Sequence, residues 1–239
     1  MRSAQESAAG VVSREECGSM LACLSALRDS CALKSRTEIE AASAIVKLLG
    51  LPSHHDRQKN WDTLKCLSWI LAETDPATPV LDAGSSQRSV ILTWLRMLGY
   101  QDLHACDLRD KQTHYEDSGI KFTVQDLCRT KYPSSFFGAV TSISVIEHGV
   151  PFDKYLAEMS RVLRPGGLLL TSTDFWSEAV DCTGIFPYGR GMPQMKVFQP
   201  HELELLCLMA ESQGLRLCGA LDLRTEERET WAWFDSTEA

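Results

Sequence analysis

The chain has 239 residues, of which 44% are hydrophobic and 23% charged, and this ordinary composition predicts one globular domain with a sizeable core. No apolar run approaches the roughly 20 residues that cross a bilayer, and no apolar segment follows the early Arg2. We therefore expect a cytoplasmic protein with no membrane partner. The net charge of -8 is not offset by any cluster of Lys and Arg, which disfavours nucleic acid as a partner.

The nine cysteines are scattered along the chain, and no Cys-x-x-Cys pair occurs among them. An odd number without such spacing predicts neither a disulfide framework nor a zinc site. We expect most of these cysteines to be small buried hydrophobes in a reducing compartment. His54 and His55 have no spaced carboxylate partners, so the sequence predicts no metal site.

The first third of the chain predicts helices. Apolar residues recur at helical spacing between Ile39 and Leu49 and again between Trp61 and Leu71. A Leu-Gly-Leu-Pro run separates the two segments. We expect residues 1–75 to form a helical N-terminal cap region and residues 76–239 to form the main domain.

Short apolar runs alternate with helical patterns in the main domain. Helical spacing follows the first run, around Trp94, and returns after Pro151. This alternation predicts a doubly wound α/β fold with a mostly parallel sheet that is covered on both faces. The runs that predict strands are residues 79–84, 103–107, 120–126, 137–144 and 168–173.

The last part of the chain begins with a long loop, residues 175–198, which is rich in Gly, Pro and aromatic residues. Pro200 opens a helix that runs to about Gln213, and residues 215–223 and 230–234 predict a closing pair of strands. A long loop at the functional end of a sheet is typical of a binding loop or lid. Its candidate contacts for a substrate are Asp174, Trp176, Asp181, Tyr188, Arg190 and Lys196.

Polar residues follow several of the predicted strands at the point where each strand ends. In an open parallel sheet, ligands bind at these carboxyl ends, near the topological switch point. Asp107 lies 23 positions after Gly84, close to the spacing at which an acidic residue meets ribose hydroxyls in dinucleotide sites. The spacing predicts a cofactor that contains adenosine.

The glycine loop indicates which adenosine cofactor is expected. A dinucleotide fold uses G-x-G-x-x-G so that the backbone approaches a pyrophosphate, whereas residues 84–89 contain a single glycine. S-adenosylmethionine has no phosphates and fits this simpler loop. A nicotinamide oxidoreductase is the weaker alternative, because no Tyr-x-x-x-Lys occurs in the chain.

Three segments in order and at the right spacing carry a family resemblance: residues 80–86 (VLDAGSS), 145–148 (VIEH) and 159–170 (MSRVLRPGGLLL). Together they resemble the methyltransferase-domain family of class I S-adenosylmethionine-dependent methyltransferases, the group that contains ubiquinone-type O-methyltransferases. The likeness extends over about residues 61–223. It implies a Rossmann-like, seven-stranded sheet whose last strand is antiparallel.

The resemblance also implies roles for individual residues. Asp82 and Gly84 would hold the methionine end of the cofactor, Asp107 the ribose hydroxyls and Asp126 the adenine amino group. Further residues expected in the cofactor site are Trp61, Ala83, Ser85, Leu108, Leu127, Ser144 and Glu147.

Two positions depart from the family pattern, because Ser86 and Arg88 stand where further glycines are usual. This departure leaves open an alternative in which the fold binds the cofactor without catalysing a reaction.

His148 is the candidate catalytic residue. It follows the fourth strand of the main domain, where a methyl acceptor approaches, and a neutral imidazole accepts a proton from a hydroxyl nucleophile. The alternative is that His148 only positions its loop, and Glu147 is open in the same way between a cofactor contact and an anchor for the turn. The expected reaction is methyl transfer to a small molecule, at a hydroxyl oxygen rather than nitrogen or carbon. The sequence does not identify the acceptor or the oligomeric state.

Overall fold

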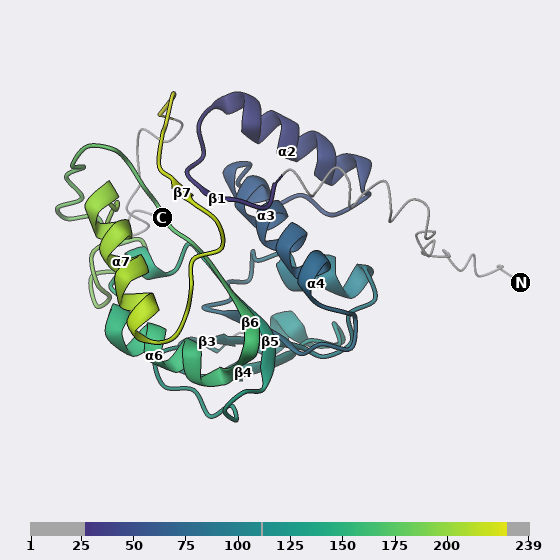
Figure 1. Ribbon diagram of the computed structural model, residues 1–239. Coiled ribbons are helices and arrows are strands. Elements are labelled where there is room, and N and C mark those ends of the chain that lie inside the picture. The colour runs from purple at the N-terminus through teal and green to yellow at the C-terminus, as the bar shows by residue number, and fades with distance from the viewer. Residues whose placement is uncertain (1–26, 111, 229–239) are drawn as a thin grey trace, which may run out of the picture.

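The computed structural model describes residues 27–110 and 112–228, and these residues form an α/β domain in which helices cover a central sheet (Figure 1). Five strands form one parallel sheet in the order β4-β3-β2-β5-β6, and two short strands pair with each other separately. The strands are β1 (Ser30–Cys31), β2 (Val80–Ala83), β3 (Leu103–Asp107), β4 (Lys121–Val124), β5 (Phe137–Ile143), β6 (Leu163–Ser172) and β7 (Leu221–Asp222). The helices are α2 (Arg36–Leu48), α3 (Gln58–Glu73), α4 (Ile91–Met97), α5 (Gln112–Tyr115), α6 (Phe152–Val162) and α7 (Pro200–Ser212), with a 3-10 turn, η1, at Ile146–His148.

The strand order of the main sheet reverses at β2, which pairs with β3 on one side and with β5 on the other. All five strands are parallel, so their carboxyl ends lie at one edge of the sheet. The junction between β2 and β5 is the topological switch point, where ligands bind in open α/β sheets. The predicted doubly wound, Rossmann-like fold with an N-terminal helical cap is confirmed.

Hydrophobic residues fill the space on both faces of the sheet, because successive side chains of a strand point to opposite faces. On β2, Val80 faces a core that α2, α3 and α4 complete, whereas Leu81 faces a second core that α6 and α7 complete. Both residues are fully buried. Figure 1 shows these two groups of helices on opposite sides of the strands. The sheet is thereby held rigidly between two layers, and its carboxyl edge is a fixed platform.

The N-terminal helices share a core with the main domain. Val46 of α2 and Leu67 of α3 are fully buried in the same cluster as Trp94 of α4. The indole Nε1 of Trp94 also donates a hydrogen bond to the carbonyl of Pro52, at 2.8 Å, in the segment between α2 and α3. The cap therefore packs as one body with the sheet.

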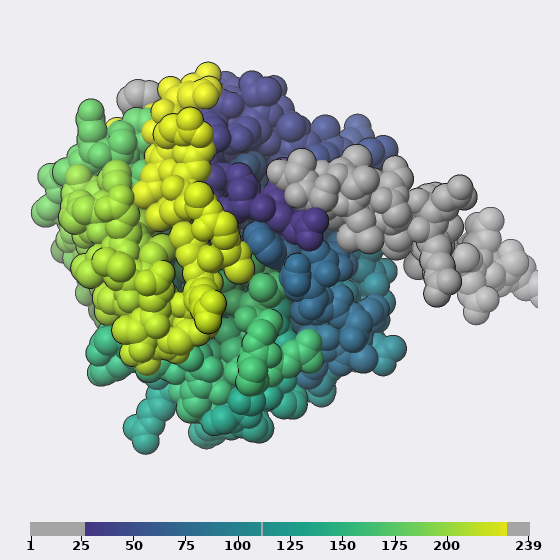
Figure 2. Space-filling model, viewed as in Figure 1, coloured from purple at the N-terminus to yellow at the C-terminus, as the bar shows by residue number. Residues whose placement is uncertain are grey.

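The C-terminal part of the structure differs from the sequence prediction. Of the strand expected at residues 215–223, only β7 forms, and it pairs in parallel with β1 instead of closing the main sheet. In the described residues the seven strands therefore divide into a five-stranded and a two-stranded sheet, and the expected antiparallel last strand does not form. Gly214 and Gly219 both have positive φ and turn the chain before β7, while the amide of Ala32 donates to the carbonyl of Asp222 at 2.8 Å. Figure 2 shows the yellow C-terminal segment running beside the purple N-terminal segment that holds β1. The other expected strand, residues 230–234, lies outside the described residues.

A second difference concerns the last strand of the main sheet. The strand expected at residues 168–173 instead begins at Leu163, directly after α6, and its pairing with β5 shifts register between Phe137 and Ala139. A β-bulge absorbs such extra residues without ending a strand, and Gly166 supplies a positive φ of 76° within it.

Two further features concern membranes and cysteines. Among the described helices, none combines the length and the apolar character needed to cross a membrane. Of the seven cysteines in this part of the chain, Cys66, Cys106 and Cys182 are buried, so the expectation that most are core residues was too broad. Cys17 and Cys23 lie outside the described residues.

The shared core predicts that one substitution in α3 destabilises the whole domain. Leu67→Ala should lower the free energy of unfolding by about 2–5 kcal/mol, because it removes buried methyl groups and leaves a cavity. The same change at Leu48, which is 81% exposed, should alter it by less than about 0.5 kcal/mol. Urea unfolding measures both. Equal effects of the two substitutions would contradict the shared core.

Candidate functional site

The turn after β2 brings two parts of the chain into close approach at the switch point. Gly84 has a φ of 81°, a left-handed conformation that favours glycine. A Cβ at this position would lie 2.7 Å from the methyl carbons of Val145, in the segment that follows β5. The amides of Gly84 and Ser85 donate to the carbonyl of Cys106 at 2.8 and 2.9 Å. Glycine is thus required at position 84 for two reasons: the left-handed backbone conformation and the close approach of Val145.

The side chain of Asp82 stabilises this turn through hydrogen bonds. Its side chain is buried, with Oδ1 accepting a hydrogen bond from Thr141 Oγ1 at 2.8 Å and Oδ2 accepting one from Ser89 Oγ at 2.7 Å. The hydroxyl of Ser85, also buried, lies 2.6 Å from that of Tyr115. The carboxylate of Asp82 therefore joins β2, β5 and the residues after the glycine turn, and it fixes the shape of the loop.

A carboxylate lies at the end of β3, at Asp107, and another follows β4 by two residues, at Asp126. Oδ1 of Asp107 accepts a hydrogen bond from the amide of Arg109, and Oδ1 of Asp126 accepts one from the amide of Cys128, both at 2.8 Å. These local turns hold the two carboxylates in place at the strand ends. Leu108, which directly follows Asp107 in the chain, is a large apolar residue and is 58% exposed. The edge thus offers acidic groups beside an apolar surface.

The segment after β5 has an uncommon backbone. Ser144 has a φ of 52°, a left-handed conformation that few residues other than glycine adopt. Its amide donates to the carbonyl of Ser172 at 3.1 Å, and its hydroxyl accepts a hydrogen bond from the ammonium group of Lys59. Such backbone conformations cluster at functional sites, because the surrounding structure must hold them.

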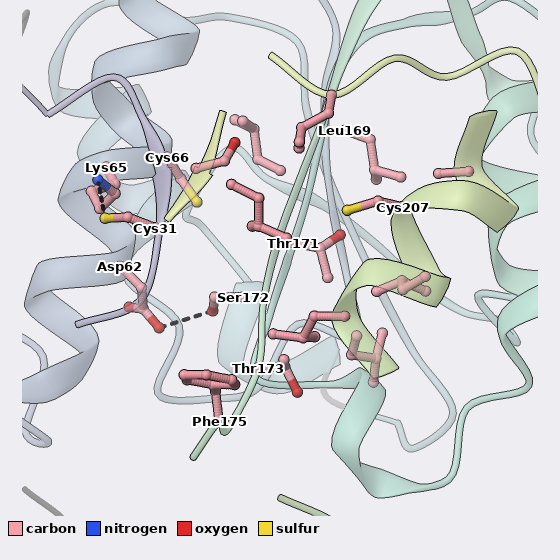
Figure 3. Close-up of a pocket in the computed structure, with 18 of the residues that line it drawn as sticks. Cys31, Asp62, Lys65, Cys66, Leu169, Thr171, Ser172, Thr173, Phe175 and Cys207 are labelled. Carbon is pink, nitrogen blue, oxygen red and sulfur yellow. Dashed lines mark hydrogen bonds between the residues drawn. The ribbon is translucent and has the colours of Figure 1, made fainter. Parts of the chain in front are cut away.

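Lys59, from α3, is the centre of a largely buried charged cluster at the ends of β5 and β6, in which Lys59 itself is half-buried. Its Nζ lies 3.8 Å from Oδ2 of Asp62 and 3.9 Å from Oδ1 of Asp174. Asp62 also accepts a hydrogen bond from Ser172 Oγ at 2.9 Å, which Figure 3 shows as a dashed line between α3 and β6. One ammonium group therefore ties the N-terminal cap to the functional edge of the sheet.

Glu147 and Asp174 complete the cluster. Oε2 of Glu147 accepts a hydrogen bond from Thr173 Oγ1 at 3.1 Å, and Glu147 is almost fully buried. Burial raises the pKa of both carboxyl groups, and the charge of Asp174 raises that of Glu147 further, whereas Lys59 lowers both. Burial would lower the pKa of Lys59, but the carboxylates, Asp62 foremost, outweigh it and raise that pKa. Lys59 therefore stays charged, and Glu147 holds its proton more tightly than an exposed glutamate.

His148 ends η1 beside this cluster. Burial, and then the positive charge of Lys59, lower the pKa of its imidazole to about 4, so the ring is neutral at physiological pH. Its Nδ1 is buried and has no hydrogen-bond partner within residues 27–110 and 112–228. Buried polar atoms are nearly always hydrogen-bonded in native proteins. A buried nitrogen without a partner is therefore a feature of this site that needs a functional explanation.

The long loop, residues 175–198, folds back onto η1. Its two ends meet in a bridge between Phe175 and Phe198, and the amide of Phe198 donates to the carbonyl of Asp174 at 2.9 Å. The amide of Lys196 donates to the carbonyl of Glu147 at 2.9 Å. Near the middle of the loop, the ring of Tyr188 packs against that of His148, with 4.6 Å between centroids.

A cavity of about 1500 Å³ lies beside β6, on the side of that strand away from β5 (Figure 3). Its lining includes Asp62 and Ser172 together with side chains of β6, α3 and α7. Neither Gly84 nor Asp107 belongs to its lining. The cavity is thus a separate space at the edge of the sheet, next to the charged cluster.

The structure brings most of the predicted residues together at one edge. Trp61 is apart from them, because it lines the cavity beside β6 and lies beneath the ammonium group of Lys65, 5.1 Å from the ring centroid. Ala83 and Leu127 are buried in the core on the α6 side. Sequence reasoning missed Arg109, whose guanidinium donates to the carbonyl of Tyr188, 79 positions later. No local pattern signals that pair.

Comparisons with known proteins agree with this architecture. Residues 81–171, from β2 to β6, match the model of a family described as a methyltransferase domain. No curated protein sequence matches the chain.

Solved structures with similar folds are distant in sequence. A phosphoethanolamine N-methyltransferase from Haemonchus contortus matches with a TM-score of 0.52 and 20% identity over 75% of this chain and 43% of that one. A Haloferax volcanii protein in complex with a methyltransferase activator matches with a TM-score of 0.51 and 14% identity over 79% and 80% of the two chains. The chain therefore spans less than half of the Haemonchus enzyme. Its fold is that of the Rossmann-like methyltransferases.

The charged cluster predicts how His148 titrates. In proton NMR, the imidazole of the wild-type protein should titrate near pH 4. Lys59→Met should raise this pKa, because a neighbouring positive charge opposes protonation of the ring. Lys65→Met, the same change on the same helix, should leave it unaltered, since Lys65 contacts Asp29 and Cys31 instead. A wild-type pKa at the ordinary value of 6.5 would contradict the burial of the ring.

Proposed function

We propose that the protein is a class I S-adenosylmethionine-dependent methyltransferase that acts on a small molecule at a hydroxyl oxygen. The observation that carries the proposal is the convergence, at the switch point, of the Gly84 turn, the strand-end carboxylates and the unpartnered Nδ1 of His148. The match of residues 81–171 to a methyltransferase domain supports it independently. The likeness to ubiquinone-type O-methyltransferases, noted in the sequence, supports oxygen as the accepting atom.

The donor groups at this edge fit S-adenosylmethionine. The tight turn at Gly84 allows close approach of an amino-acid-like group without the extra glycines that a pyrophosphate needs. The carboxylate of Asp107 suits ribose hydroxyls, and that of Asp126 suits the adenine amino group, since both of those groups donate hydrogen bonds. The exposed side chain of Leu108 gives the adenine ring an apolar surface. When bound, the cofactor supplies an electrophilic methyl group on a sulfonium sulfur.

The protein's own residues align the acceptor and move its proton. The low pKa of His148 keeps its ring neutral at physiological pH, and in the tautomer that carries its proton on Nε2 the ring accepts the hydroxyl proton at Nδ1. Because a base with this pKa is weak, the site favours an acceptor whose hydroxyl is itself acidic. Glu147 is buried and His148 half-buried, which limits the access of water to the reacting atoms, and alignment contributes the rest of the rate.

The structural neighbours include enzymes described with small-molecule substrates, such as the Haemonchus phosphoethanolamine N-methyltransferase. This likeness supports a small molecule as the acceptor. A screen of hydroxylated compounds, with release of S-adenosylhomocysteine as the readout, should identify it.

The first test of the site concerns Asp107. Asp107→Ala should weaken S-adenosylhomocysteine by about 1.5–3 kcal/mol, or roughly 10- to 150-fold in Kd, because the ribose hydroxyls lose a charged acceptor. Isothermal titration calorimetry gives the Kd values. Asp110→Ala is the matched control, since it also removes a local carboxylate-to-amide bond and should leave the Kd nearly unchanged. An unaltered Kd in Asp107→Ala would mean that Asp107 only caps its strand.

The second test concerns the base. With the acceptor from the screen, His148→Ala should reduce kcat by about 10²–10⁴-fold while the Kd for S-adenosylhomocysteine stays the same. His201→Ala, at an exposed histidine of α7, should keep full activity. The wild-type kcat should fall only as the pH approaches about 4, because protonated imidazole accepts no proton. A kcat of His148→Ala within a few-fold of the wild-type value would mean that His148 is not the base and that alignment of the reactants is the main source of the rate.

A further inference from the structure

The ring of His148 must be held in one orientation for its Nδ1 to take part in the proposed reaction. No hydrogen bond at Nδ1 within the described residues fixes that orientation. The backbone amide of His148 donates to the carbonyl of Val145 at 3.1 Å, which fixes the main chain and leaves the side-chain torsions undetermined. The contact that constrains the ring is an edge-to-face one with Tyr188, at 4.6 Å between centroids and 82° between planes. Such aromatic pairs have a preferred geometry, so Tyr188 selects one orientation of the imidazole.

Tyr188 is itself held in place by Arg109, two residues after the end of β3. Nη2 of Arg109 donates a hydrogen bond to the carbonyl of Tyr188 at 2.7 Å, and its guanidinium lies 5.4 Å from the centroid of the tyrosine ring. The backbone of Arg109 is in turn fixed by its amide, which donates to Oδ1 of Asp107. The side chain of Arg109 therefore contacts both the main chain and the ring of Tyr188.

The loop needs this contact in its middle. The two ends of residues 175–198 are anchored by the bridge of Phe175 with Phe198 and by the bond of Lys196 to Glu147. Between them, Gly184 and Gly189 both have positive φ, and Gly189 is next to Tyr188. Glycine-rich segments lose much conformational freedom on ordering, so a fixed position for Tyr188 depends on an external contact. Arg109 supplies it.

We propose that Tyr188, clamped by Arg109, is a positioning residue that orients His148 toward the methyl acceptor. The proposal rests on the proposed function, and it extends the working part of the site to a loop outside the residues matched to the methyltransferase domain. It also joins the strand that ends at the cofactor's expected ribose site to the catalytic imidazole. The geometry of the reaction then depends on a pair that is separated by 79 positions in the chain.

The contact is tested first in the protein without cofactor or acceptor. The ring current of Tyr188 should shift the imidazole proton NMR signals of His148. Tyr188→Phe keeps the ring and should keep this shift, whereas Tyr188→Leu should abolish it. Arg109→Met should reduce it, because the tyrosine ring loses its clamp. Arg96→Met, the same change at an exposed residue of α4, should have no effect.

The same four variants are then compared in turnover with the identified acceptor. Misplacing a catalytic group by about 1 Å costs up to roughly 100-fold in rate. Tyr188→Leu and Arg109→Met should therefore lower kcat by about 10- to 100-fold, while the Kd for S-adenosylhomocysteine stays within about twofold of wild type. Tyr188→Phe and Arg96→Met should retain the wild-type kcat.

The outcomes separate this proposal from the proposed function. If Tyr188→Leu keeps the ring-current shift, or keeps the wild-type kcat when His148→Ala is inactive, Tyr188 does not position His148 and the methyltransferase account stands. If S-adenosylhomocysteine does not bind at all, the proposed function fails, and the role of Tyr188 in the reaction fails with it. A loss of kcat that phenylalanine restores and leucine does not supports the positioning role, since a general loss of folding would alter cofactor affinity as well.

Discussion

The ammonium group of Lys59 is enclosed by carboxylates at the point where the N-terminal helices meet the ends of β5 and β6. It donates to Ser144 and lies within 4 Å of Asp62 and Asp174. Removing one partner from such a buried cluster leaves the remaining charges uncompensated, which is costly in a poorly solvated site. Three features of the site surround this one charge: the left-handed backbone at Ser144, the bond from Asp62 to β6, and the imidazole of His148, whose pKa the charge lowers in addition to burial.

The glycine turn is the second constraint on the site. The two carboxylate oxygens of Asp82 accept hydrogen bonds from Thr141 and Ser89, so Asp82 stabilises the conformation of the loop. The extra glycines that a phosphate-binding loop needs are absent, and Gly84 alone makes the close approach to Val145. The site is thus built from a braced turn, two strand-end carboxylates and a neutral imidazole.

The sequence predicted the parts of this site that follow local patterns. An apolar run followed by an acidic residue marks the end of a buried strand, and β3, which ends at Asp107, was predicted with its observed bounds. The pairing of distant side chains leaves no local trace, so neither the bond between Lys59 and Ser144, 85 positions apart, nor the clamp of Arg109 on Tyr188 was predicted. The closing strand at residues 215–223 was wrong for a similar reason, since its contact with β1 depends on the N-terminal segment.

The central claim is that this edge of the sheet binds S-adenosylmethionine, and direct binding calorimetry tests it. S-adenosylhomocysteine, the product form of the cofactor, should bind the wild-type protein with one site per chain, and NAD should produce no measurable heat of binding. The distinction follows from the single-glycine turn, which accommodates an amino-acid-like group and lacks the close backbone approach that a pyrophosphate requires. Binding of NAD with no binding of S-adenosylhomocysteine would contradict the account.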